Sequence, residues 1–196
     1  MMRNLVLTIV AGCLAVSCAT NSSYQPNSDP EQIEFKQARL DVYPEDVRND
    51  PSRYTNTLVV WPGVIRSTHA QDEDYRGRIR AETVLEHHYF DWKQDHGDQG
   101  VKLLLSRRGE GAFRVRWHLV KTGPDATSGD AETYAGRDKL AIVYGTPESV
   151  DADGTVVLQY RYMRAVDRAH YSVNQMDYGR LGDWLTNSAV ATAPSH

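Results

Sequence analysis

The sequence predicts an all-β protein with a minor helical part, folded as a small barrel or sandwich of five to six antiparallel strands. Short runs of β-branched and aromatic residues recur along the chain, and turns rich in Gly, Asp and Pro separate them. The strongest run, residues 57–66, has Pro62 and Gly63 in its middle. Because proline removes one ladder hydrogen bond, a bulge or sharp bend is expected there, and such coiling favours a closed barrel.

The elements are expected in the following order. A short helix begins near Asp29, which would cap it, with Pro30 in the first turn, and a second short helix or turn covers 45–49. The predicted strands span residues 57–66, 79–92, 101–105, 113–119, 139–146 and 155–166. The alternation in the fourth strand points four apolar side chains inward: Phe113, Val115, Trp117 and Leu119. A hairpin turn is expected at 151–154.

The first eighteen residues indicate secretion as a lipoprotein. Arg3 precedes an apolar run, and small residues precede Cys18. The residues before Cys13 match the lipobox consensus better than those before Cys18. Cleavage at Cys13, however, would leave an apolar core of only about six residues, below the usual minimum of about 7. Cys18 is therefore the predicted lipidation site, with Cys13 as the alternative. The apolar run is shorter than the roughly 20 residues that a membrane-spanning helix needs.

This assignment divides the chain. Residues 1–17 are the predicted signal peptide, 18–28 a flexible tether, 29–185 a single β-barrel domain and 186–196 a disordered tail. Ala19 follows the cysteine, whereas an aspartate there retains enterobacterial lipoproteins at the inner membrane. The expected location is therefore the outer membrane, with the domain facing the periplasm. The only bound group expected is covalent lipid on Cys18.

Three segments resemble the starvation lipoprotein (Slp) family. Pro51-x-x-Tyr54, leading into the strand at 60–65, is similar to that family's first strand. Gly136-Arg137 with the apolar run after it, and the Tyr-x-Tyr strand at 160–166, are similar to later family segments. The resemblance covers residues 51–171 loosely. It implies an outer-membrane lipoprotein with an OB-like β-barrel, and the family name implies a link to starvation or stress.

One cluster has the residue types of a metal site: His87-His88-x-x-Asp91, with His96 beyond it. Imidazole and carboxylate suit zinc or copper. If 79–92 is one strand, His87 and Asp91 share a face, and His96 could join them from the following turn. The alternative interpretation, which we prefer, is a solvated strand edge without a metal ion.

Two further groups of residues suggest binding surfaces. Basic residues concentrate at Arg107, Arg108, Arg114 and Arg116. The last two share the outward face of a strand, where they would contact an acidic partner or a lipid headgroup or, more simply, pair with neighbouring Asp and Glu. Aromatic residues form the second group. They could make a stacking platform for a ligand, but we prefer the interpretation that they pack in the core. They are Tyr89, Phe90, Trp92, Trp117, Tyr160, Tyr162 and Tyr171. The formal net charge of −4 argues against nucleic acid as a partner.

The sequence contains no Gly-x-Ser-x-Gly, His-Glu-x-x-His, Ser-x-x-Lys or Walker motif, and no catalytic residue is assigned. It predicts a non-enzymatic, lipid-anchored outer-membrane lipoprotein of the Slp type that is a binding or structural module of the cell envelope. Membrane lipid is its expected partner, through the acylated cysteine. The alternatives are a periplasmic metal-binding protein using His87, Asp91 and His96, and an adaptor for another envelope protein through the arginine-rich face.

Overall fold

The computed structural model describes residues 22–73, 78–97, 100–120, 127–174 and 179–180. The predicted signal peptide, Cys18 and the predicted tail at 186–196 lie outside these residues. Within the described part, no helix is both long and apolar enough to cross a membrane.

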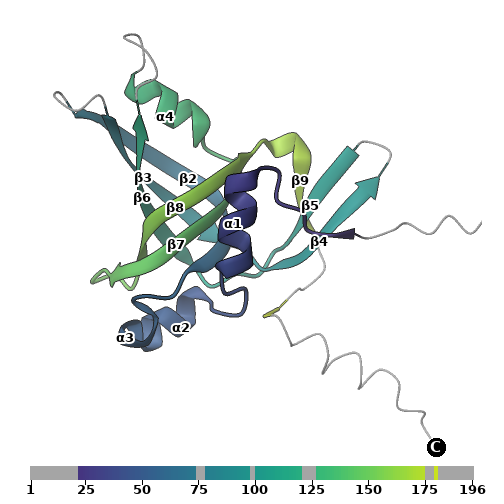
Figure 1. The fold of residues 1–196 in the computed structure, drawn as a ribbon, viewed down its shortest axis with the longest axis horizontal. Helices are drawn as coiled ribbons and strands as arrows, with labels where there is room; N and C mark the ends of the chain where they lie inside the picture. Colours follow the sequence, from purple (N-terminus) through teal and green to yellow (C-terminus); the bar gives the residue numbers. More distant parts are fainter. Residues whose placement is uncertain (1–21, 74–77, 98–99, 121–126, 175–178, 181–196) are drawn as a thin grey trace, which may run out of the picture.

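Five strands form a closed barrel, which confirms the predicted fold class (Figure 1). They are β2 (Val59–Glu73), β3 (Arg78–His87), β6 (Ala112–Val120), β8 (Val156–Val166) and β7 (Leu140–Val150), in that order around the barrel. Helix α4 (Ser128–Tyr134) connects β6 to β7. This is a Greek-key order, as in OB-fold barrels. The expectation of purely antiparallel strands is wrong for the pair β6 and β8, which is parallel.

The predicted distortion of the first long strand occurs slightly later than expected. Pro62 and Gly63 pair regularly with β7, and the register shift in β2 lies between Ile65 and Ser67. Gly63 is needed for close packing, because a Cβ there would lie 2.8 Å from the ring of Phe113. The shift leaves Arg66 without a paired residue on β3, and such a bulge re-aims the side chain that it carries.

Alternating side chains fill the barrel. Along β6, Phe113, Val115 and Trp117 are buried as predicted, whereas Leu119 is only half-buried. Trp61 on β2 packs against Phe113 and donates its indole N–H to the carbonyl of Val42 at 2.7 Å. The hydrogen bond satisfies the one polar atom of this buried ring and ties the segment before helix α2 (Pro44–Asn49) to the barrel.

A second sheet of four strands stands beside the barrel (Figure 1). It contains β1 (Ser22–Ser23), β4 (Phe90–Gly97), β5 (Gly100–Ser106) and β9 (Tyr171–Asn174), in the order β1-β4-β5-β9. The strands β5 and β9 are parallel. The single strand predicted at 79–92 is therefore wrong: β3 ends at His87, and β4 begins at Phe90 in the other sheet.

The described part of the predicted tether, residues 22–28, belongs to the fold, which corrects the boundary at residue 28. Ser22 and Ser23 pair with β4, and Tyr24 is only 4% exposed. The Tyr24 hydroxyl donates to Glu31, a fully buried carboxylate that also accepts from the Tyr144 hydroxyl at 3.2 Å. An aromatic ring and a buried acid therefore hold residues 22–28 against the barrel.

Short helices complete the structure. Helix α1 (Asp29–Gln37) is capped by Ser28 rather than by Asp29 as predicted, because the Ser28 hydroxyl accepts from the backbone of Glu31. Helices α2 (Pro44–Asn49) and α3 (Pro51–Tyr54) follow, each with proline in its first turn. A 3₁₀ turn, η1 (Arg168–His170), precedes β9.

Candidate functional site

The residues proposed for a metal site do not share one strand. His87 is buried at the end of β3, and its Nδ1 accepts the backbone N–H of Glu110 at 3.2 Å. Asp91 lies in β4, in the other sheet. The backbone of His96 is also in β4, but its side chain is outside the described residues. Among the described residues, no three His, Cys, Asp or Glu side chains are grouped as metal ligands.

The environment of His87 also disfavours a charged state of its ring. Burial, together with smaller effects of the neighbouring His88, Arg48 and Arg180 side chains, lowers the pKa of His87 to about 3. A neutral ring with its Nδ1 lone pair engaged fits the role of a hydrogen-bond acceptor inside the fold.

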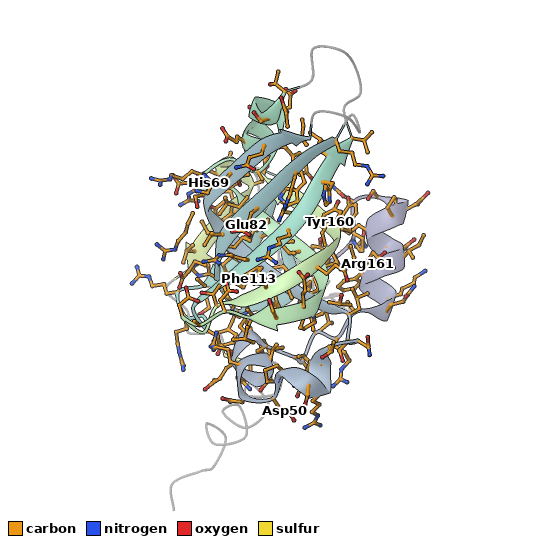
Figure 2. All side chains as sticks on the ribbon, turned by 90° about the vertical axis from the view of Figure 1, so that its left-hand side faces the viewer. Asp50, His69, Glu82, Phe113, Tyr160 and Arg161 are labelled. Atoms are coloured by element: carbon orange, nitrogen blue, oxygen red, sulfur yellow. The ribbon has the colours of Figure 1, made fainter. Side chains whose placement is uncertain are left out.

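The arginine-rich face of β6 is paired within the chain, as the simpler interpretation predicts. Arg114 forms an ion pair with Asp151, and the Arg116 Nε lies 3.1 Å from an oxygen of Glu82 (Figure 2 labels Glu82 on this face). Glu148 and Asp153 lie within 4 Å of the same two guanidinium groups. This surface has little unpaired positive charge to offer a partner.

The aromatic residues are mostly core residues, as preferred, and they are divided among three clusters, with Tyr89 in a small one beside Tyr43. Phe90 and Trp92 pack against Tyr24 and Phe35 beside the second sheet. Trp117 is 3% exposed inside the barrel, and its indole N–H donates to Thr83. They therefore form no single stacking platform.

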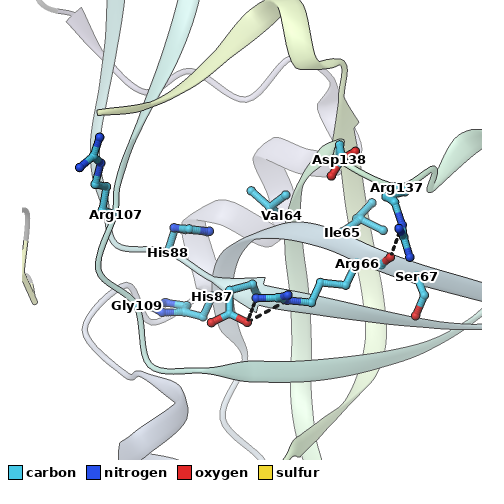
Figure 3. Close-up of a pocket in the computed structure, with 11 residues that line it drawn as sticks. Val64, Ile65, Arg66, Ser67, His87, His88, Arg107, Gly109, Arg137 and Asp138 are labelled. Carbon is cyan, nitrogen blue, oxygen red and sulfur yellow. Dashed lines mark hydrogen bonds and ion pairs between the residues drawn. The ribbon is translucent and has the colours of Figure 1, made fainter. Parts of the chain in front are cut away.

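The site that the structure does present is a cleft of about 580 Å³ where the barrel meets the second sheet (Figure 3). Four segments line it: the bulge of β2, the end of β3, the connection from β5 to β6, and the turn before β7. The lining residues are Val64, Ile65, Arg66, Ser67, Glu86, His87, His88, Arg107, Gly109, Arg137 and Asp138. This volume is in the range of small-molecule sites, about 300 to 1,000 Å³.

Local backbone contacts fix the walls of this cleft. The N–H of Asp138 donates to the carbonyl of Ile65 at 3.0 Å, and the N–H of Ile65 donates to Lys139 at 2.8 Å. Asp138 has a φ of 64°, a left-handed conformation that aspartate tolerates better than most residues. On the other wall, a Cβ on Gly109 would lie 1.7 Å from the carbonyl oxygen of His87. Glycine is therefore required for this close approach.

Positive charge exceeds negative charge in the cleft, since three arginines face two carboxylates. Arg66 is neutralised by Glu86, with an Nη2 to Oε2 distance of 2.8 Å. Arg137 donates through Nε to the carbonyl of Arg66 at 3.1 Å (Figure 3). Neither the terminal nitrogens of Arg137 nor the guanidinium of Arg107 bond to any residue that the structure describes. The cleft therefore has unused cationic donors.

His88 adds a polar group to the same cleft. Its Nδ1 lies 2.8 Å from the carbonyl oxygen of Ser106. Because a carbonyl only accepts, Nδ1 carries the hydrogen, and Nε2 is left as an acceptor when the ring is neutral. Figure 3 shows the ring directed across the cleft toward Val64.

Beside this open cleft lies a closed polar network around Glu110, a residue only 8% exposed. The Tyr89 hydroxyl and the Arg180 Nε donate to Oε1 of Glu110 at 2.8 and 2.7 Å. Arg180 also donates through Nη1 to Asp46 and through Nη2 to Glu45. All three kinds of guanidinium nitrogen are thus engaged, and the network ties residue 180 to α2.

From the polar lining of this cleft, sequence reasoning singled out His87, His88 and Arg107 as candidate binding residues, and it named Arg137 only within the family resemblance. Arg66 and Arg137 are far apart in sequence, and only the pairing of β2 with the turn before β7 brings them together. No family model, curated protein or solved structure matches the chain.

Proposed function

We propose that the protein is a lipid-anchored lipoprotein of the outer membrane, similar to the Slp family, whose domain is a non-catalytic binding module facing the periplasm. The observation that carries the proposal is the N-terminal pattern, in which a basic residue, an apolar core and small residues lead to Cys18. Several acyl chains on that cysteine would hold the domain stably at the membrane, whereas one chain holds only marginally.

The binding role draws support from the cleft between the barrel and the second sheet. Its walls come from four separate segments, two of which are fixed by backbone contacts and by the close approach of Gly109. Its arginines have donors that the fold does not use. By contrast, the fold uses the Nδ1 of His87 and pairs the arginines of β6, which weakens the metal-binding and adaptor alternatives.

Metabolic labelling with an alkyne fatty acid tests the anchor. We expect the wild-type protein to label and to fractionate with the outer membrane. Cys18→Ala should lose both properties. Cys13→Ala, the matched control, should keep the label. If Cys18→Ala labels and Cys13→Ala does not, Cys13 is the lipid site; if the wild-type protein does not label, the lipoprotein proposal is wrong.

A further inference from the structure

We propose that the second sheet docks against the lipid surface of the membrane, with the half-buried Trp92 of β4 at the depth of the lipid headgroups. The proposal rests on the lipid anchor proposed above, and it names the part of the fold that faces the lipid. It is independent of the cleft, whose lining does not include Trp92.

The first argument is the length of chain between the acylated cysteine and the fold. Residues 19–21 alone separate Cys18 from β1, where Ser22 pairs with Gln94 and Ser23 with Lys93. An extended chain spans at most about 3.6 Å per residue, so the Cα atoms of Cys18 and Ser22 lie within about 14 Å of each other. A domain of this size has a diameter on the order of 40 Å. The side of the domain that carries β1 therefore faces the membrane, and the opposite side of the barrel cannot reach it (Figure 1).

The second argument is a set of contacts that keeps this connection short. Tyr24 directly follows β1, and its hydroxyl donates to the fully buried carboxylate of Glu31. The backbone N–H of Asn27 donates to the other oxygen of Glu31 at 2.9 Å, and the N–H of Tyr24 donates to the carbonyl of Trp92 at 2.8 Å. Without these contacts the chain from Cys18 to the start of α1 could span about 40 Å, enough for any side of the domain to face the membrane.

The third argument is the conformation of Trp92. Its φ of 55° is rare for a bulky side chain, and it lies where the register between β4 and β5 shifts, between Phe90 and Gln94. A bulge re-aims the side chain that it carries, and backbone strain of this kind is concentrated at functional sites. The indole packs against the rings of Tyr24, Phe35 and Phe90, at centroid distances of 5.5, 5.5 and 4.9 Å. The bulge therefore holds this ring beside the segment that leads to the anchor.

The fourth argument is the chemistry of the indole. Trp61 and Trp117 are buried in the barrel, and their N–H groups donate to Val42 and Thr83. Trp92 is only half-buried, and among the residues that the structure describes none accepts a hydrogen bond from its N–H. A ring with an apolar body and an unbonded N–H is favoured at the boundary between membrane and water, where both parts are satisfied.

The experiment measures the tryptophan fluorescence of the native acylated protein in vesicles of phosphatidylcholine, with or without bromine on the acyl chains near the headgroup. Every variant carries Trp184→Phe, because Trp184 lies outside the described residues. We expect bromine to quench part of the emission, and Trp92→Phe, which keeps an aromatic ring in the cluster, to lose that quenching. The matched control is Trp117→Phe, which removes a buried tryptophan of the barrel and should leave the quenching intact. Phosphatidylcholine has no net charge, so the quenching reports insertion of the ring rather than attraction between charges.

A labelled cysteine gives a second measurement that leaves the aromatic cluster unchanged. The proposed mature chain has no free thiol, because Cys13 leaves with the signal peptide and Cys18 carries the lipid. A nitrobenzoxadiazole fluorophore is attached at Gln25→Cys, an exposed position beside Tyr24, or at Asp153→Cys, an exposed position in the turn between β7 and β8. This turn lies on the opposite side of the fold from β1 (Figure 1). Bromine should quench the label at position 25 and leave the label at position 153 almost unchanged.

Flotation of the vesicles separates the docking proposal from the anchor. Protein that floats with the vesicles but shows no bromine quenching, or equal quenching of the two labels, would overturn docking and leave the anchor standing. Quenching that persists undiminished in Trp92→Phe would overturn the role of Trp92. Protein that does not float would overturn both the anchor and the docking.

Discussion

His87 and His88 are neighbours in the chain, yet they belong to regions of opposite electrostatic character. His87 is 1% exposed, and its Nδ1 accepts from Glu110, whose carboxylate is held by Arg180. His88 lies in the open cleft, and its Nδ1 donates to Ser106. The chain crosses from the barrel to the second sheet at these two residues, so one peptide separates a closed polar network from an open cationic cleft.

The difference shows which charges maintain this fold and which are available for binding. A buried carboxylate such as Glu110 is costly without compensation, so the guanidinium of Arg180 is structurally required. Exposed guanidinium groups such as those of Arg107 and Arg137 cost little when they are unpaired, because water solvates them. Unpaired arginines in a shaped cleft are therefore the better guide to function in this protein.

The largest expected effect is acid destabilisation through the closed network. Burial lowers the pKa of His87 to about 3 in the folded state, against an ordinary value of about 6.5 in the unfolded chain. Between these values the unfolded state binds more protons, so stability falls as the pH drops from about 6.5 toward 3. We expect this histidine to contribute a loss of up to about 3 kcal/mol between pH 6.5 and 4.

Urea unfolding between pH 4 and 7 measures this effect. His87→Asn keeps an acceptor near the position of Nδ1 but does not titrate, so its stability should vary less with pH in this range. Carboxylates contribute equally to both proteins and cancel in the comparison. An unchanged slope in His87→Asn would mean that His87 is not the buried neutral base described above.

Removing the arginine of the closed network should have the next largest effect. Arg180→Gln leaves Glu110 and Asp46 without their charged partner, and we expect it to lower the free energy of unfolding by about 2 kcal/mol, a figure reduced for the partial exposure of Arg180. The control is Arg39→Gln, since both side chains of the Arg39–Asp41 ion pair are more than half exposed. Equal stabilities of the two variants would contradict a structural role for the network.

Removing an arginine of β6 should have an intermediate effect on the free energy of unfolding. Arg114→Gln removes ion pairs between partly exposed side chains, and we expect a loss of about 0.5 to 1 kcal/mol. The loss should shrink at 1 M salt, because surface charges are screened there. Unfolding at low and high salt measures this, and a loss that does not depend on salt would indicate a packing role for the arginine stem instead.

Much of the barrel is visible in the sequence, because the β-branched runs of β2, β7 and β8 must be buried whatever their neighbours. The division of residues 79–92 into two strands is not visible in the sequence, because the partial alternation continues through His88 and Tyr89. Only tertiary hydrogen bonds place the second strand in another sheet. The described part of the predicted tether had a local signal in Tyr24, an aromatic ring in a polar stretch. The cleft as a whole had no local signal in the sequence. Only strand pairing and close packing bring Arg66, Arg107 and Arg137 to its lining.

The smallest change in stability is expected for a variant of the cleft, Arg137→Gln. Arg137→Gln removes an exposed guanidinium with no described carboxylate partner, and only its bond to the Arg66 carbonyl is lost. We expect the free energy of unfolding to change by less than about 0.5 kcal/mol.

Measuring the free energy of unfolding of Arg137→Gln and Arg180→Gln side by side is therefore the most direct test. We predict a change of less than about 0.5 kcal/mol for Arg137→Gln and a loss of about 2 kcal/mol for Arg180→Gln. Equal losses in the two variants would contradict the distinction between charges that hold this fold and charges that the fold does not use.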